Sequence, residues 1–191
     1  GPTLWPADRT EFVKAESNWV ERCPHIDMLH SSCLAVGIAW ESADIYWVFG
    51  AVSKNTGLGY GLCKYDFKVD HGPGNTNHSD GTKDHHIIGQ LSRKTGIPGH
   101  MAYDSVTKLL YICDTGNSRV VTFDTTQTGT VSQTFATGLF ANDGIDRIRT
   151  GTSTNTFIAA GAIDDPCGIE LYNNILFISD NATGKIYAYD K

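Results

Sequence analysis

The stretch from residue 99 to residue 124, GHMAYDSVTKLLYICDTGNSRVVTFD, decides the fold that this sequence predicts. Runs of alternating apolar and polar residues lie on either side of a polar turn, which begins at Asp114 and ends at Arg119. A period of two is typical of β-strands, and Gly and Asn between two such runs indicate a tight turn. The stretch therefore predicts consecutive antiparallel strands, the last of which ends at Asp124.

The same order of strands and turns occurs three times in the chain, at residues 37–67, 100–124 and 168–190. Each copy ends in an aromatic residue followed by an aspartate, namely Tyr65 and Asp66, Phe123 and Asp124, and Tyr189 and Asp190. The segments 83–92 and 129–138 follow the first two copies, and each is predicted to form a fourth, outer strand. Four-stranded antiparallel meanders that repeat along a chain are the blades of a β-propeller, so the predicted fold class is all-β.

The sequence LLYICDTGNSRVVTFD (109–124) resembles the NHL repeat. In that repeat an aliphatic strand ends in aspartate, a Gly-Asn turn and an arginine follow, and an aromatic residue and an aspartate close the unit. The third copy shares the pattern with Lys185 in place of the arginine, and the first copy has an expanded turn at 50–61. The resemblance implies NHL-like propeller blades. Such propellers generally close with about six blades, whereas this chain holds three recognisable ones.

We predict an N-terminal segment at 1–33 and a propeller region at 34–191, with blades at about 34–92, 97–138 and 164–191. An open arc of three blades leaves sheet edges and faces that another element must cover. The arc is therefore closed by oligomerisation, by further blades of a longer propeller, or by a degenerate blade hidden at residues 138–165.

Oligomerisation itself has two forms. Two copies pair into a ring, or a strand near the N-terminus completes the last blade of a neighbouring copy and builds filaments. The donated strand would lie within residues 9–15 and include Glu11, Phe12 and Val13.

Composition limits the partners of the chain. The 191 residues carry a net charge of −6, and lysine and arginine are scattered along the sequence. Without a basic patch to neutralise phosphates, we expect no binding to nucleic acid or to an anionic membrane surface. No apolar stretch approaches the roughly 18–20 residues of a membrane span, so we predict none.

Cysteines and sequons favour a secreted, extracellular glycoprotein. Cys23 and Cys33 flank a short loop that a disulfide would close, while the pairing of the other three cysteines stays open. Asn77 and Asn181 each begin an Asn-X-Ser/Thr sequon in a turn-like context and are candidate glycosylation sites. Disulfides and N-glycans both belong to oxidising, extracellular compartments.

The Gly- and Pro-rich loop at 70–86 carries the densest set of candidate metal ligands, which includes Asp70, His71, His78 and Asp80. Carboxylates with backbone carbonyls suit calcium, and imidazoles suit zinc. The alternative is a solvated turn with incidental histidines.

His100 is a further candidate ligand, because it follows Pro98 at the predicted start of an inner strand. In the peptidyl-hydroxyglycine α-amidating lyases, which are NHL-type propellers, three histidines from different blades hold zinc near such strand starts. His100 lies one place beyond the matching position, and the other two copies have no histidine there. The alternative is a buried, hydrogen-bonded histidine near the channel.

The function predicted from these features is that of a non-enzymatic, extracellular structural or interaction protein. It would self-assemble, or bind other extracellular proteins, through blade edges and a donated N-terminal strand, and it would form filaments if the contact is repeated. The alternative is a metal-dependent lyase or hydrolase that resembles the α-amidating lyase propeller. A third reading is a carbohydrate-binding module, in which Trp5, Trp19, Trp40 and Trp47 would stack on sugars of a glycan. Trp40 and Trp47 fall on predicted strand positions, where packing between blades explains them equally well.

Overall fold

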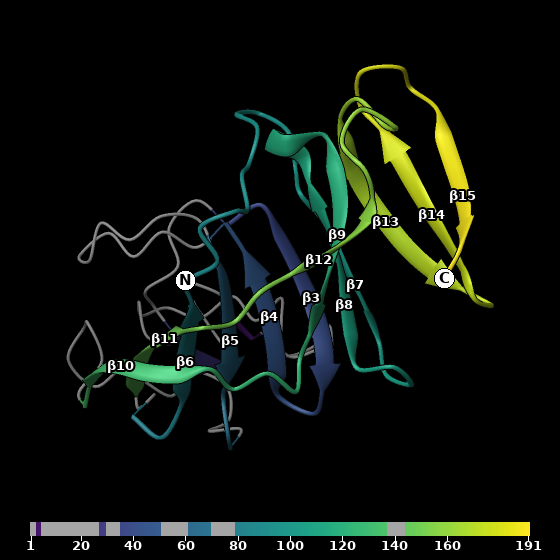
Figure 1. Cartoon of the computed structure of the whole chain (residues 1–191). Helices are drawn as coiled ribbons and strands as arrows, with labels where there is room; N and C mark the ends of the chain where they lie inside the picture. The colour runs from purple at the N-terminus through teal and green to yellow at the C-terminus, as the bar shows by residue number, and fades with distance from the viewer. Residues whose placement is uncertain (1–2, 5–26, 30–34, 51–60, 70–78, 137–143) are drawn as a thin grey trace, which may run out of the picture.

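The computed structural model describes residues 3–4, 27–29, 35–50, 61–69, 79–136 and 144–191. These residues form three blade-like sheets that follow one another from one end of the molecule to the other (Figure 1). The predicted all-β class is confirmed, and within the described residues no sheet closes into a barrel. A separate pair of short strands, β1 (Thr3–Leu4) and β2 (Asp27–Met28), completes the fold.

The first sheet begins as the predicted four-stranded antiparallel meander. Its strands are β3 (Gly37–Ser42), β4 (Ile45–Phe49), β5 (Leu62–Asp66) and β6 (Thr82–His86). The fourth strand predicted at 83–92 is therefore present as β6. Two more strands extend this sheet beyond β6: β11 (Ile145–Thr150) pairs with β6 in parallel, and β10 (Thr130–Phe135) pairs with β11.

The second sheet contains β7 (Met101–Asp104), β8 (Leu109–Asp114), β9 (Arg119–Asp124) and β12 (Asn155–Ile158). A short 3-10 turn, Thr115–Asn117, joins β8 to β9. The strand predicted at 129–138 exists as β10, but its predicted place was wrong, because it joins the first sheet and β12 takes the outer position of the second. The described part of 138–165 supplies β11 and β12 to these two sheets, so it forms no blade of its own.

The third sheet consists of β13 (Pro166–Tyr172), β14 (Ile175–Asp180) and β15 (Ile186–Asp190). Asn173 and Asn174 both adopt the left-handed region, with φ of 48° and 65°. Two left-handed residues between antiparallel strands form the turn whose twist suits a tight hairpin, and asparagine tolerates this conformation well. These two asparagines therefore fix the register in which Tyr172 pairs with Ile175.

Apolar side chains between successive sheets form the core. Between the first and second sheets the buried residues include Trp47, Phe49, Leu62, Met101, Leu110, Ile112 and Phe123. Between the second and third sheets they include Tyr111, Cys113, Val120, Ile169, Leu176 and Ile178. Alternate residues of β8 thus point to opposite sheets, as the period-2 pattern of the sequence predicts.

The inner strands of the three sheets meet where each strand begins. The Gly99 N–H donates to the Val36 carbonyl at 3.0 Å, and the His100 N–H donates to the Cys167 carbonyl at 2.9 Å. These bonds join the first sheet to the second and the second to the third. The three sheets therefore form one continuous arc around their inner strands.

Candidate functional site

The exposed face of the third sheet is the candidate interaction site. Tyr172 is 66% exposed and Ile186 is 72% exposed, and Phe177 between them is also exposed. Phe177 pairs with Glu170 on β13, and Ser179 pairs with Ile186 on β15, so these side chains share one face of the sheet. We call this surface, made of Glu170, Tyr172, Phe177, Ser179 and Ile186, the trailing face.

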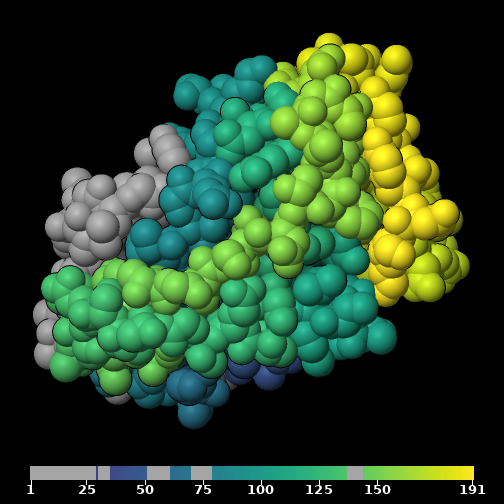
Figure 2. All heavy atoms as spheres, in the orientation of Figure 1, coloured from purple at the N-terminus to yellow at the C-terminus, as the bar shows by residue number. Residues whose placement is uncertain are grey.

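The equivalent surface of the second sheet is buried in the same molecule. Tyr111 and Cys113 of β8 occupy the places that Phe177 and Ser179 occupy in β14. Tyr111 and Cys113 are buried, because the third sheet packs on them. The trailing face is therefore the exposed equivalent of a surface that is buried one blade earlier. Figure 2 shows the third sheet at one end of the molecule.

A shallow hollow of about 280 Å³ lies on the trailing face. His100, Glu170, Phe177, Ser179 and Ile186 line it, together with two residues of β13. His100 is exposed, so it is not the buried histidine of the alternative reading. Its side chain lies at the junction of the second and third sheets, where it adds a polar edge to the hollow.

The opposite end of the arc also presents apolar side chains. Trp40 is 60% exposed and Ile38 is 55% exposed, both on β3. They lie on the side of β3 opposite to Ala39, which packs toward the second sheet. The Trp40 indole N–H donates to the Ala43 carbonyl at 2.8 Å and so fixes the ring. We call the surface of Ile38 and Trp40 the leading face.

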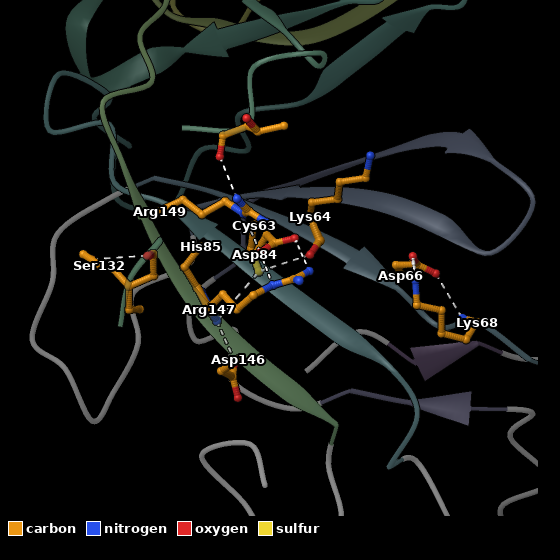
Figure 3. A network of polar contacts seen from close by, with 12 residues as sticks. Cys63, Lys64, Asp66, Lys68, Asp84, His85, Ser132, Asp146, Arg147 and Arg149 are labelled. Atoms are coloured by element: carbon orange, nitrogen blue, oxygen red, sulfur yellow. Dashed lines mark hydrogen bonds and ion pairs between the residues drawn. The ribbon is translucent and has the colours of Figure 1, made fainter. Parts of the chain in front are cut away.

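The parallel pairing of β11 with β6 brings a set of charged side chains together, and Figure 3 shows their contacts. On one side of the sheet, Asp146 accepts from Lys83 Nζ at 3.1 Å and contacts His85 Nε2 at 2.7 Å. Burial alone would lower the pKa of His85, but the Cys63 sulfur and the Asp146 carboxylate raise it to about 10. The raised pKa favours the protonated imidazole, which Asp146 holds.

Cys63, His85 and Asp146 have the residue types of a nucleophilic triad but lack its geometry. The Cys63 sulfur lies 4.0 Å from His85 Nε2, the same nitrogen that contacts Asp146. A triad needs the acid on one ring nitrogen and the nucleophile on the other. Cys63 is also fully buried, so a substrate has no access to its sulfur. This cluster is structural.

The other side of β6 and β11 carries a second group of charged residues. Arg147 and Arg149 both contact Asp84, with Nε to Oδ1 distances of 2.7 and 2.6 Å. His86 lies on the same side and contacts the rings of Trp47 and Phe123, which also contact each other. Burial, opposed by Asp84 and assisted by nearby cations, lowers the pKa of His86 to about 4. His86 is therefore neutral at pH 7.

The residues predicted for a metal site are placed as follows. Asp80 lies in an exposed turn before β6, and His100 lies on the trailing face. Asp70, His71 and His78 lie outside the described residues. Within the described ranges, no three His, Cys, Asp or Glu side chains are grouped so that they could hold a metal ion.

Other predicted residues also fall outside the described part of the chain, namely Cys23, Cys33, Asn77, Glu11, Phe12 and Val13. The three cysteines that the structure describes, Cys63, Cys113 and Cys167, are free thiols. Asn181 is exposed in the turn between β14 and β15. Trp47 is fully buried, so it offers no ring surface for a sugar.

Sequence reasoning missed Asp146, Arg147 and Arg149. Residues 145–150, IDRIRT, lack the period-2 alternation of a half-buried strand, because the two isoleucines lie three positions apart. The partner strand β6 lies about sixty residues earlier in the chain, and local patterns do not identify partners at that separation. The contact of Asp146 with Lys83, and the contacts of Arg147 and Arg149 with Asp84, therefore follow only from the three-dimensional structure.

Comparison of the chain with protein-family models, with curated proteins and with solved structures finds no match. Within the described residues, no helix has the length and apolar character needed to cross a membrane.

Proposed function

We propose that this protein is a non-enzymatic, extracellular interaction module that assembles head to tail. In this proposal the trailing face of one copy packs on the leading face of the next copy. The observation that carries it is the exposure of Phe177 at a position whose equivalent, Tyr111, is buried by a following sheet. The third sheet buries this surface of the second sheet, so we expect another copy of the chain to bury the equivalent surface of the third sheet.

The two faces differ in composition, which favours a contact between unlike surfaces. The leading face offers the indole of Trp40, and the trailing face offers a hollow of about 280 Å³ beside Phe177 and Ile186. An aromatic side chain seated in an apolar pocket is the usual centre of a protein interface. Contacts between two different surfaces of one chain generate rings when the rotation closes and filaments when it does not.

Most of the first sheet's outward side is unsuited to this role, because its residues are already covered. Val48, Cys63, Tyr65 and Phe67 are buried together with Leu29. The exposed part is the β3 edge with Ile38 and Trp40. On the first sheet, the proposed contact is therefore centred on the inner strand β3.

The relationship to NHL-like propellers and the extracellular location belong to the same proposal. The repeated strand order and the aspartates at the ends of β8 and β14 support the former. The exposed sequon at Asn181 supports the latter. N-glycosylation would shift the electrophoretic mobility of the secreted protein, and glycosidase treatment would remove that shift. A glycan on Asn181 would be absent from the Asn181→Gln variant.

Sedimentation velocity over a range of protein concentrations tests the proposed function. We expect the mass of the wild-type protein to rise with concentration and the Ile186→Glu variant to stay monomeric. Val106→Glu is a matched control, because Val106 is 83% exposed in the turn between β7 and β8 of the second sheet and belongs to neither face. A wild-type protein that stays monomeric at every concentration, or an Ile186→Glu variant that assembles like the wild type, would overturn the proposal.

A further inference from the structure

A polar pocket of about 220 Å³ lies between the first sheet and the segment that follows β9. Strands β5, β6 and β11 form one wall, and Thr125, Gln127 and Thr128 form the other. Four cationic side chains line it, namely Lys64, Lys68, Arg147 and Arg149, against two carboxylates, Asp66 and Asp84. In a chain with a net charge of −6, this pocket concentrates positive charge.

The two lysines are already neutralised by nearby carboxylates. Lys64 pairs with Glu41 at 3.2 Å, and Lys68 pairs with Asp66. Lys64 also lies over the Trp47 ring, 5.4 Å from its centroid. These two cations therefore contribute little net charge to the pocket.

The two arginines, by contrast, share a single carboxylate. Arg147 donates to Asp84 through Nε and Nη2, and Arg149 donates to the same Asp84 through Nε. One of the two guanidinium charges is therefore not balanced at Asp84. The side chains of Arg147 and Arg149 are 31% and 15% exposed, so solvent screens this charge only in part.

The arginines also retain donors that the protein does not use. Arg149 Nη1 donates to the Thr128 carbonyl at 2.8 Å, which ties the second wall of the pocket to the first. After these bonds, Nη1 of Arg147 and Nη2 of Arg149 have no acceptor among the described residues. Guanidinium groups with spare donors and surplus charge bind planar or tetrahedral oxyanions with good geometry.

We propose that this pocket binds a small oxyanion, whose phosphate or carboxylate oxygens accept hydrogen bonds from Arg147 and Arg149. The Thr82 side chain lines the same pocket and offers a further hydroxyl group. The pocket volume accommodates one such group together with a small organic moiety. Binding would also strengthen the attachment of β11, which arrives from a distant part of the chain, to the first sheet.

Calorimetric titration with inorganic phosphate and with acetate, at an ionic strength held constant with sodium chloride, tests this site. We expect saturable binding of at least one of the two anions, and their relative affinities distinguish a phosphate ligand from a carboxylate ligand. Arg147→Gln should weaken that binding by about tenfold or more, the effect of losing one charge-assisted hydrogen bond. Arg149 remains on Asp84 in this variant, so the carboxylate keeps a partner.

Lys94→Gln is the matched control, because Lys94 is a half-exposed cation that pairs with Asp165 outside the pocket. Its removal lowers the total charge equally and should leave the affinity unchanged. Should Arg147→Gln fail to fold, Arg147→Lys keeps the charge, removes the planar fork, and should also weaken binding. If neither phosphate nor acetate shows saturable binding, the proposal is overturned. Equal affinity of the wild type and a folded Arg147 variant would also overturn it.

Discussion

Asp114 and Asp180 occupy equivalent positions at the ends of β8 and β14, and each ties its strand to the loop that precedes the same blade. Asp114 Oδ1 accepts the Ser92 N–H at 2.6 Å, and Asp180 Oδ1 accepts the Asp165 N–H at 3.0 Å. Both carboxylates also accept bonds from the turn that follows their strand. The repeated aspartate therefore has a structural role, because it connects the loop before each blade to the turn after the strand. The polar turn at 114–119 contributes to the same structure.

Replacement of Asp114 should destabilise the second blade strongly. Asp114 is fully buried and accepts bonds from Asn117 at 2.9 Å and from Arg119 at 2.6 Å. Asp114→Asn removes the negative charge and leaves Arg119 without its ion partner, so we expect a loss of about 3 kcal/mol or more. Urea denaturation measures this loss, and the exposed Asp164→Asn is the control. A loss equal to that of the control would refute the assigned role.

A methyl group at Gly37 should separate the first two sheets. A Cβ atom there would lie 2.2 Å from the Gly99 carbonyl oxygen, which is a backbone atom that cannot rotate away. We therefore expect Gly37→Ala to lower the free energy of unfolding by about 1–3 kcal/mol. Gly89→Ala is the matched control, because a Cβ at Gly89 meets no atom within 4 Å. Equal thermal stability of the two variants would show that the sheets do not approach as described.

The buried cluster at Asp146 should tolerate no loss of its carboxylate. Lys83 and Asp146 are both fully buried, and the raised pKa of His85 makes it a second cation on the same carboxylate. Asp146→Asn removes the carboxylate that faces Lys83 and His85 away from water, so we expect a destabilisation of about 3–5 kcal/mol. Chemical denaturation of Asp146→Asn beside Asp80→Asn, an exposed aspartate, provides the comparison. Near-equal unfolding midpoints would contradict this prediction.

His86 should make the protein sensitive to mild acid. Its pKa is about 4 in the folded protein against an ordinary value of 6.5, so the unfolded chain binds the proton more tightly. Stability is therefore fully present above pH 6.5 and falls as the pH decreases toward 4, by up to about 3 kcal/mol. His86→Gln should lose less stability between pH 7 and pH 4.5 than the wild type. An identical pH dependence of the unfolding midpoints of the two proteins would disprove the assignment.

The sequence predicts those parts of the fold that depend on local pattern. The strands from Met101 to Asp124 and from Pro166 to Asp190 follow from period-2 alternation and from turn residues such as Asn173 and Asn174. Each strand in these two stretches pairs with the strand next to it in the sequence, so the partner is always close along the chain. Local signals are sufficient in such cases.

Long-range pairing is what the sequence does not reveal. Strand β10 is predicted in the second sheet but lies in the first, because it pairs with β11, and β11 pairs in parallel with β6 from about sixty residues earlier in the chain. The candidate surfaces share this property. Trp40 and Ile186 look like ordinary strand residues, and only the stacking of the sheets shows that both stay exposed at opposite ends of the arc.

Mixing two variants that each lack one face tests the head-to-tail contact most directly. Trp40→Glu removes the leading face and Ile186→Glu removes the trailing face, and both side chains are exposed in the single chain. Each variant alone should sediment as a monomer. An equimolar mixture should form a dimer and nothing larger, because one intact leading face meets one intact trailing face. A mixture that stays monomeric, or a Trp40→Glu variant that assembles on its own, would contradict the head-to-tail account.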